Sequence, residues 1–142
     1  MISPEKAADL RVKQLEMLQG LVNRMAGYGA SFKSYCITVV TAVIGFAFTL
    51  HSPLVAGLAI LPVIFFALAD AQYLKVERRF RDIFNTVRKA GWDEMPSFDL
   101  NPRNGPAQSL PAALLSWSIV YFYAPLALVV LAVAVGAWVY GR

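Results

Sequence analysis

The chain has 142 residues, of which 58% are hydrophobic and only 15% are Asp, Glu, Lys or Arg, with a net charge of +4. In soluble domains these four residue types make up about 25% of all residues. The shortage is concentrated, because none of the four occurs in residues 34–69 or in residues 104–141. Such runs exclude a soluble surface, and they fit lipid, where about 20 mainly apolar residues form one span. The composition therefore predicts an all-α membrane protein.

Several kinds of functional site are excluded by residue counts. Cys36 and His51 are the single cysteine and histidine, which excludes an intrachain disulfide and a metal site built from several such residues. The sequence contains no phosphate loop, nucleophile elbow or metalloprotease helix. We therefore expect a non-enzymatic protein without a cofactor.

Residues 1–33 are expected to form a cytoplasmic amphipathic helix. Ser3-Pro4-Glu5 is typical of a helix start. Leu15, Leu18, Val22 and Met25 then recur at spacings of three and four, as one apolar stripe does on a helix. Charges run through residues 1–31, so a cleavable signal peptide is not expected, and the first apolar segment is predicted to stay as an anchor.

The first charge-free run is too long for one span and slightly short for two. His51-Ser52-Pro53 interrupts it, so we predict a first span over residues 34–51, an external turn at 52–53 and a second span over 54–70. A shallow re-entrant hairpin is the alternative. Both interpretations place the two ends of the run on the same side of the membrane.

The second span is predicted to continue as a cytoplasmic amphipathic helix over residues 71–91. Its apolar positions are Val76, Phe80, Ile83, Phe84 and Val87, and basic side chains fill most of the others. A connector with four prolines follows over residues 92–111, and the third span is expected over residues 112–140.

Charge predicts the topology. The segments before the first span and between the second and third hold 12 of the 13 Lys and Arg residues, and Arg142 is the remaining one. Basic segments stay in the cytoplasm. We therefore expect a multi-pass protein of the bacterial inner membrane, with its N-terminus cytoplasmic and its C-terminus periplasmic or external.

An antiparallel hairpin of the first two helices makes a checkable prediction, since positions at equal depth should sum to about 105. The expected apolar pairs are Met25 with Phe80, Val22 with Ile83, and Leu18 with Val87. The expected charge pairs are Glu16 with Lys89, Arg24 with Asp82, and Lys33 with Asp70 or, at the same level, Gln72. A cytoplasmic two-helix stalk results. The competing interpretation lays residues 75–89 flat on anionic lipid.

Two further patterns are candidates for function. A small, weakly polar stripe runs along the first span: Ser34, Thr38, Thr41, Gly45 and Thr49. It can line an oligomeric pore or serve as a packing seam, because small residues let membrane helices approach closely. The Arg78-Arg79-x-Arg81 cluster can bind phosphate, or it can be a solvated face that obeys the positive-inside rule.

Asp70 is a further candidate, because an ionisable residue at membrane depth is costly and is often functional. The ordinary interpretation is an interfacial charge paired with Lys33.

Several motifs resemble an uncharacterised family of small bacterial multi-pass membrane proteins. They are Leu18-Gln19-Gly20-Leu21-Val22-Asn23-Arg24-Met25-Ala26, then Ser31-Phe32-Lys33, and Leu68-Ala69-Asp70-Ala71-Gln72-Tyr73-Leu74-Lys75-Val76-Glu77-Arg78-Arg79-Phe80-Arg81. Gly27-Tyr28-Gly29-Ala30 departs from the pattern. The resemblance implies no activity, but it gives weight to nine polar, charged or aromatic residues: Gln19, Asn23, Arg24, Lys33, Asp70, Tyr73, Glu77, Arg78 and Arg81.

Two hypotheses follow. The first is a homo-oligomer that perturbs the membrane or forms a pore, as an effector of the kind found beside defence systems. The second is an anchor or scaffold whose basic helix recruits a cytoplasmic protein partner or anionic lipid. Membrane lipid is an expected partner in both, and nucleic acid is not.

Overall fold

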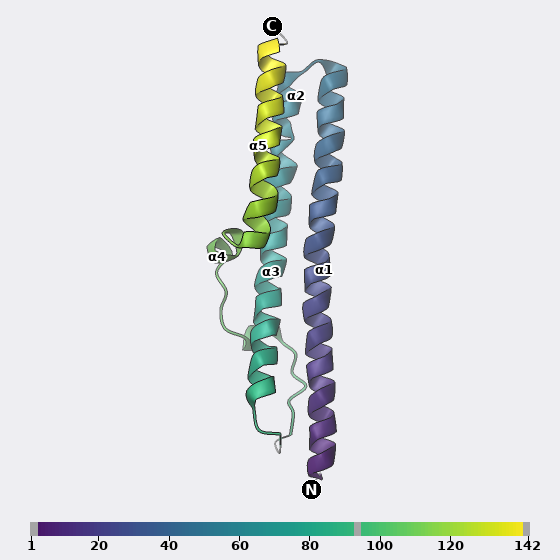
Figure 1. Cartoon of the computed structure of the whole chain (residues 1–142), viewed down its shortest axis with the longest axis vertical. Helices are drawn as coiled ribbons and strands as arrows, with labels where there is room; N and C mark the ends of the chain where they lie inside the picture. The colour runs from purple at the N-terminus through teal and green to yellow at the C-terminus, as the bar shows by residue number, and fades with distance from the viewer. Residues whose placement is uncertain (1–2, 93–94, 141–142) are drawn as a thin grey trace.

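The computed structural model describes residues 3–92 and 95–140, and within those ranges it contains helices and no strands. Figure 1 shows two long helices, α1 (Pro4–Leu50) and α3 (Ile60–Lys89), lying side by side and antiparallel. The last helix, α5 (Trp117–Tyr140), lies against the half of α3 that adjoins the α1–α3 turn. Three helical stretches, Pro4–Leu50, Pro53–Lys89 and Trp117–Tyr140, are long and apolar enough to cross a membrane.

Helix α1 is uninterrupted for 47 residues, or about 70 Å at ~1.5 Å per residue. It begins as expected, because the Ser3 hydroxyl accepts a hydrogen bond from the Lys6 amide (3.3 Å) and Pro4 occupies the first helical position. The described parts of the predicted segments 1–33 and 34–51 therefore form one rod over Pro4–Leu50. The two glycines at positions 27 and 29 do not interrupt it.

The turn after α1 has the chemistry that ends one helix and starts another. His51 adopts a left-handed backbone (φ 50°, ψ 38°), and the Ser52 amide donates to the Ala47 carbonyl (3.1 Å). The Ser52 hydroxyl then accepts from the Val55 amide (3.4 Å), with Pro53 at the start of the short helix α2 (Pro53–Leu58).

The predicted second span is divided at Ala59, between α2 and α3. Pro62 explains the division. In a continuous helix its ring would clash with the Leu58 carbonyl, whereas in the first turn of α3 its missing N–H is not needed. From Ile60 the helix runs unbroken through Lys89. Residues 75–89 therefore belong to the same helix as the end of the predicted second span.

The last apolar segment also begins later than expected. Residues 110–114 form a separate short helix, α4 (Leu110–Leu114), whose Ala113 is buried and which packs on α3. Leu115 leaves the helical backbone (ψ 5°), and the Ser116 carbonyl then accepts from the Val120 amide (2.9 Å). The continuous helix thus starts at Trp117 rather than at residue 112. The expected position of Arg142 lies outside the described residues.

Two apolar cores are stacked along the long axis. The stalk core joins Leu18 and Val22 of α1 to Phe80 of α3, with Met25, Ile83 and Val87 packed around it. These residues belong to the two apolar stripes that are predicted from the sequence to face each other across the hairpin. The bundle core lies at the other end and joins all three long helices; its buried members are Cys36, Val40, Ala59, Val63, Ala71, Ala113, Ile119, Tyr123 and Val130.

The connector runs back along the stalk. A single 3₁₀ turn, η1 (Pro102–Asn104), lies against α3, and Leu100 packs on the stalk core. Gly105 lies so close to α3 that a Cβ atom there would be 2.9 Å from the Arg79 carbonyl oxygen. The proline-rich segment is therefore docked on the stalk, and it carries the chain back to the level at which α5 begins (Figure 1).

Candidate functional site

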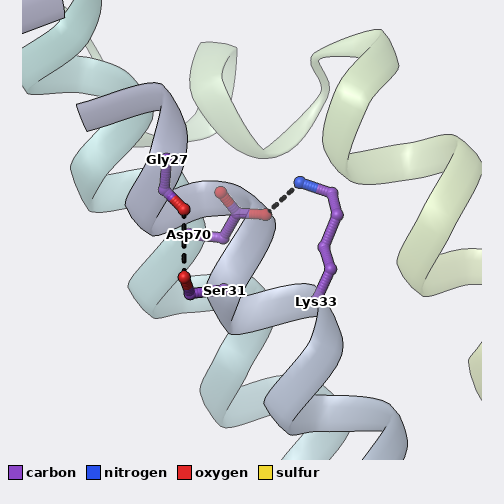
Figure 2. Close-up of polar contacts among 4 residues, drawn as sticks. All are labelled: Gly27, Ser31, Lys33 and Asp70. Atoms are coloured by element: carbon purple, nitrogen blue, oxygen red, sulfur yellow. Dashed lines mark hydrogen bonds and ion pairs between the residues drawn. The ribbon is translucent and has the colours of Figure 1, made fainter. Parts of the chain in front are cut away.

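An ion pair separates the two cores. The Lys33 ammonium of α1 lies 2.5 Å from the Asp70 Oδ2 of α3, and the two side chains are 21% and 5% exposed. Figure 2 shows the two side chains reaching toward each other across the helix pair. Each of them bounds a charge-free run, Lys33 before residue 34 and Asp70 after residue 69. A buried pair of this kind is costly to split, because either charge alone would remain desolvated.

Gly29 is what lets Asp70 reach this position. A Cβ atom at residue 29 would lie 2.8 Å from Asp70 Oδ1, closer than van der Waals contact allows. A Cβ atom at Gly27, two residues earlier on the same helix, would meet nothing within 4 Å. Only the second of the two glycines therefore has a packing reason to lack a side chain.

The rings of α5 close the ion pair from a third side. The Lys33 Nζ lies 5.9 Å from the ring centres of both Phe122 and Tyr123, within the range of cation–π attraction. Tyr123 is 5% exposed, and its hydroxyl interacts with the Asp70 carboxylate. The site is therefore assembled from α1, α3 and α5 together.

A cavity of about 310 Å³ opens beside the pair. Its polar lining comes from four side chains on three helices: Lys33, Asp70, Glu77 and Ser118. Glu77 is 12% exposed at its side chain and accepts a hydrogen bond from Arg81, one helical turn along α3. The cavity thus contains both signs of charge at the junction of the two cores.

The other charged or aromatic candidates do not converge on this pair. Tyr73 packs its ring on Tyr28 (5.3 Å between centres) and on Phe32 (5.2 Å), beside the pair. Arg78 donates to the Ala112 carbonyl at 3.4 Å and so reaches the short helix α4. Arg24 is exposed and has no hydrogen bond or ion pair with the part of the chain that the structure describes.

Two of the expected charge pairs are absent from the structure. Glu16 pairs with Lys13 on its own helix (3.2 Å) instead of with Lys89. Asp82 accepts a hydrogen bond from Gln108 of the connector (3.1 Å) instead of pairing with Arg24. Both predictions were wrong for the same reason: exposed ion pairs contribute little, so local partners and the docked connector decide the contacts.

The weakly polar stripe lies on the outside of the molecule. All five members are exposed: Ser34, Thr38, Thr41, Gly45 and Thr49. At about 100° per residue they are on the opposite face of α1 from the buried Cys36, Val40 and Ala47. Two of the hydroxyls are satisfied by their own helix, because Thr38 donates to the Ser34 carbonyl and Thr49 to the Gly45 carbonyl. The stripe therefore packs on nothing within this chain.

Two polar side chains for which the sequence gives no signal also fasten the stalk. Arg11 is 4% exposed and donates to the carbonyls of Val87 (3.3 Å) and Gly91 (2.8 Å), at the end of α3. Gln14 donates to the Ser97 carbonyl of the connector. Helix ends carry free carbonyls, but no sequence pattern tells which distant side chain reaches them.

No group of three or more His, Cys, Asp or Glu side chains suited to a metal occurs in residues 3–92 and 95–140. No protein-family model matches the chain, and searches of the curated proteins and of the solved structures return no similar protein. The family resemblance indicated by the motifs therefore remains a prediction.

Proposed function

We propose that this protein is a non-enzymatic, homo-oligomeric protein of the bacterial inner membrane, in which copies associate through the outer face of α1 and alter membrane permeability. The single observation that carries the proposal is the position of the small-residue stripe. It faces away from the bundle core, so its small side chains are available to a neighbouring copy and to no helix of the same chain.

The composition of the outer surface supports the membrane placement. The helices expose large apolar side chains at the level of the bundle core, including Phe46 (67%), Leu54 (76%) and Phe65 (66%). Monomeric soluble proteins rarely expose a contiguous apolar patch of more than a few hundred Å². Lipid is the solvent that such a surface fits.

The stalk would then project into the cytoplasm. The positive-inside rule places the basic ends of α1 and α3 there, together with the docked connector. Because α1 and α3 continue without a break from the stalk into the proposed spans, a partner that binds the stalk would act on rods that also form the membrane assembly. The stalk is thus the proposed trigger end.

Permeability tests the function. We expect overexpression to collapse the membrane potential reported by a voltage-sensitive dye, and we expect Thr41→Leu or Gly45→Leu to abolish the effect by blocking close approach. Phe46→Leu is the matched control, because Phe46 is 67% exposed and lies next to the stripe but not on it. A normal potential at full expression of the wild-type protein would refute the effector function.

Assembly is tested separately. The mass of the purified protein, measured by light scattering in mild detergent with correction for the detergent, should correspond to four or more chains. Three spans in one chain do not enclose a channel, so a monomer would contradict a pore. Accessibility of reporters fused to the two ends would test the proposed orientation.

A second function is favoured by a groove on the stalk. An open depression between α1 and α3 is lined by four polar side chains, Gln19, Asn23, Arg81 and Asn85, together with the aromatic ring of Phe84. Polar side chains around an apolar floor suit a protein partner, so the chain would serve as a membrane anchor. Arg78→Glu combined with Arg81→Glu should abolish recruitment while the membrane stays sealed. An unchanged set of co-purified proteins would count against this function.

A further inference from the structure

We infer that the cavity beside Lys33 and Asp70 binds the headgroup of a phospholipid that carries a primary ammonium, phosphatidylethanolamine being the type. The inference rests on the membrane placement proposed above but not on oligomer or pore formation. It is carried by the four polar side chains that α1, α3 and α5 bring to one opening.

The level of the cavity is that of a headgroup layer. Lys33 and Asp70 mark the ends of the charge-free runs on their helices. On α5 the same level carries Trp117 and Tyr121, which are 75% and 70% exposed and lie with their rings 5.6 Å apart. Exposed Trp and Tyr side chains favour the membrane–water interface. A cavity at this level is accessible to lipid headgroups.

The charges of the lining select the type of headgroup. Lys33 and the Ser118 hydroxyl offer donors to a phosphate, and Ser118 is exposed. Glu77 and Asp70 offer acceptors to an ammonium. Because two carboxylates balance the ammonium of Lys33 and the guanidinium of Arg81, the site has no surplus positive charge with which to hold an anionic headgroup.

The acceptors also distinguish between zwitterionic headgroups. An ethanolamine ammonium donates charge-assisted hydrogen bonds to carboxylates, whereas a choline ammonium has no N–H to donate. The volume of about 310 Å³ lies within the range of small-molecule sites, about 300–1,000 Å³, and is sufficient for a phosphoethanolamine group. The acyl chains would lie against the exposed apolar side chains of the bundle.

Native mass spectrometry of the full-length protein, purified in detergent and stripped of lipid, tests the inference without any variant. Four lipids with identical acyl chains are added: phosphatidylethanolamine, its N-methyl and N,N-dimethyl forms, and phosphatidylcholine. We expect binding to fall along the series and to be about tenfold weaker for the last, the effect of one lost charge-assisted hydrogen bond. Equal binding along the series, or preferred binding of phosphatidylglycerol, would overturn the inference.

Two variants locate the site. Glu77→Gln should remove the preference for ethanolamine over choline, whereas Glu16→Gln, an exposed carboxylate on the stalk, should keep it. Ser118→Ala should weaken the binding of both lipids equally, because the phosphate is common to them. Ser34→Ala, on the outer face of α1, should leave the binding of both unchanged. An unchanged preference in Glu77→Gln with wild-type helix content by circular dichroism would overturn the assignment.

A soluble form of the headgroup distinguishes a membrane lipid from a free metabolite of the same chemistry. Glycerophosphoethanolamine should not compete at concentrations where the lipid is bound, because it lacks the acyl chains. Competition at equal concentration would make the site one for a free metabolite and overturn the lipid assignment. Carbonate extraction tests the membrane placement independently, because an integral membrane protein resists it. A protein released by carbonate would contradict the placement, whereas equal binding of the four lipids would contradict only the headgroup selection.

Discussion

Gly29→Ala is the sharpest test of the junction between the two cores. The added Cβ atom would lie 2.8 Å from Asp70 Oδ1 and 3.8 Å from its Cγ. Asp70 has a short side chain, is 5% exposed and is held at its other oxygen by Lys33, so it cannot move away without lengthening a buried ion pair. Overpacking of this kind costs about 1–3 kcal/mol.

The same substitution also has a favourable term. Alanine is better than glycine in a helix interior by about 1 kcal/mol. Gly27→Ala gains that term alone, because its Cβ atom would meet nothing within 4 Å. We therefore expect Gly27→Ala to stabilise the protein by about 1 kcal/mol and Gly29→Ala to be less stable than Gly27→Ala by about 1–3 kcal/mol.

Reversible unfolding in mixed micelles of mild detergent and SDS, followed by circular dichroism, measures this difference. The comparison between the two alanine variants cancels the helix-propensity term and leaves the clash. If Gly29→Ala proves as stable as Gly27→Ala, the Asp70 carboxylate does not lie against α1, and the reasoning about the junction fails.

Three further predictions use the same measurement. Lys33→Met and Asp70→Leu should each destabilise by about 3 kcal/mol, because each leaves one charge buried alone, and the double variant should lose much less than the sum; additive losses would contradict a paired site. Arg11→Ala should destabilise by about 1–3 kcal/mol, since it frees the carbonyls at the end of α3, and Arg11→Lys should not restore both hydrogen bonds; wild-type stability in Arg11→Ala would refute the cap. His51→Gly should be neutral or stabilise by up to about 1 kcal/mol, because glycine adopts the left-handed backbone at φ 50° without a steric cost; a loss of stability would give the imidazole a structural role.

The sequence was sufficient for features that repeat with a known period. Apolar residues at spacings of three and four define which face of a helix is buried, so Leu18, Val22 and Phe80 could be placed together before their contacts were known. The absence of charge over two long runs likewise predicted three helices long and apolar enough to cross a membrane. Both signals are sums over many residues, which makes them robust.

Features that depend on one contact between distant residues were not predictable in the same way. Nothing local to Arg11 indicates that it reaches the carbonyls of Val87 and Gly91. The docked connector has no periodicity, and its close contact at Gly105 follows from the path of the whole segment. The polar pair of Lys33 and Asp70 was foreseeable as a pair, but the contribution of Tyr123 was not, because α5 follows the irregular connector, which sets no register between them.

The stacking of two cores along unbroken helices has a consequence for how the protein comes apart. In the proposed placement the hydrophobic effect stabilises the stalk core, which lies in water. The bundle core is stabilised by packing among helices that are already in lipid. Urea acts on the first and leaves the second largely untouched, whereas SDS reaches both. The two halves of one continuous helix would thus unfold separately. Unfolding that starts at the cytoplasmic end would stop at the ion pair of Lys33 and Asp70.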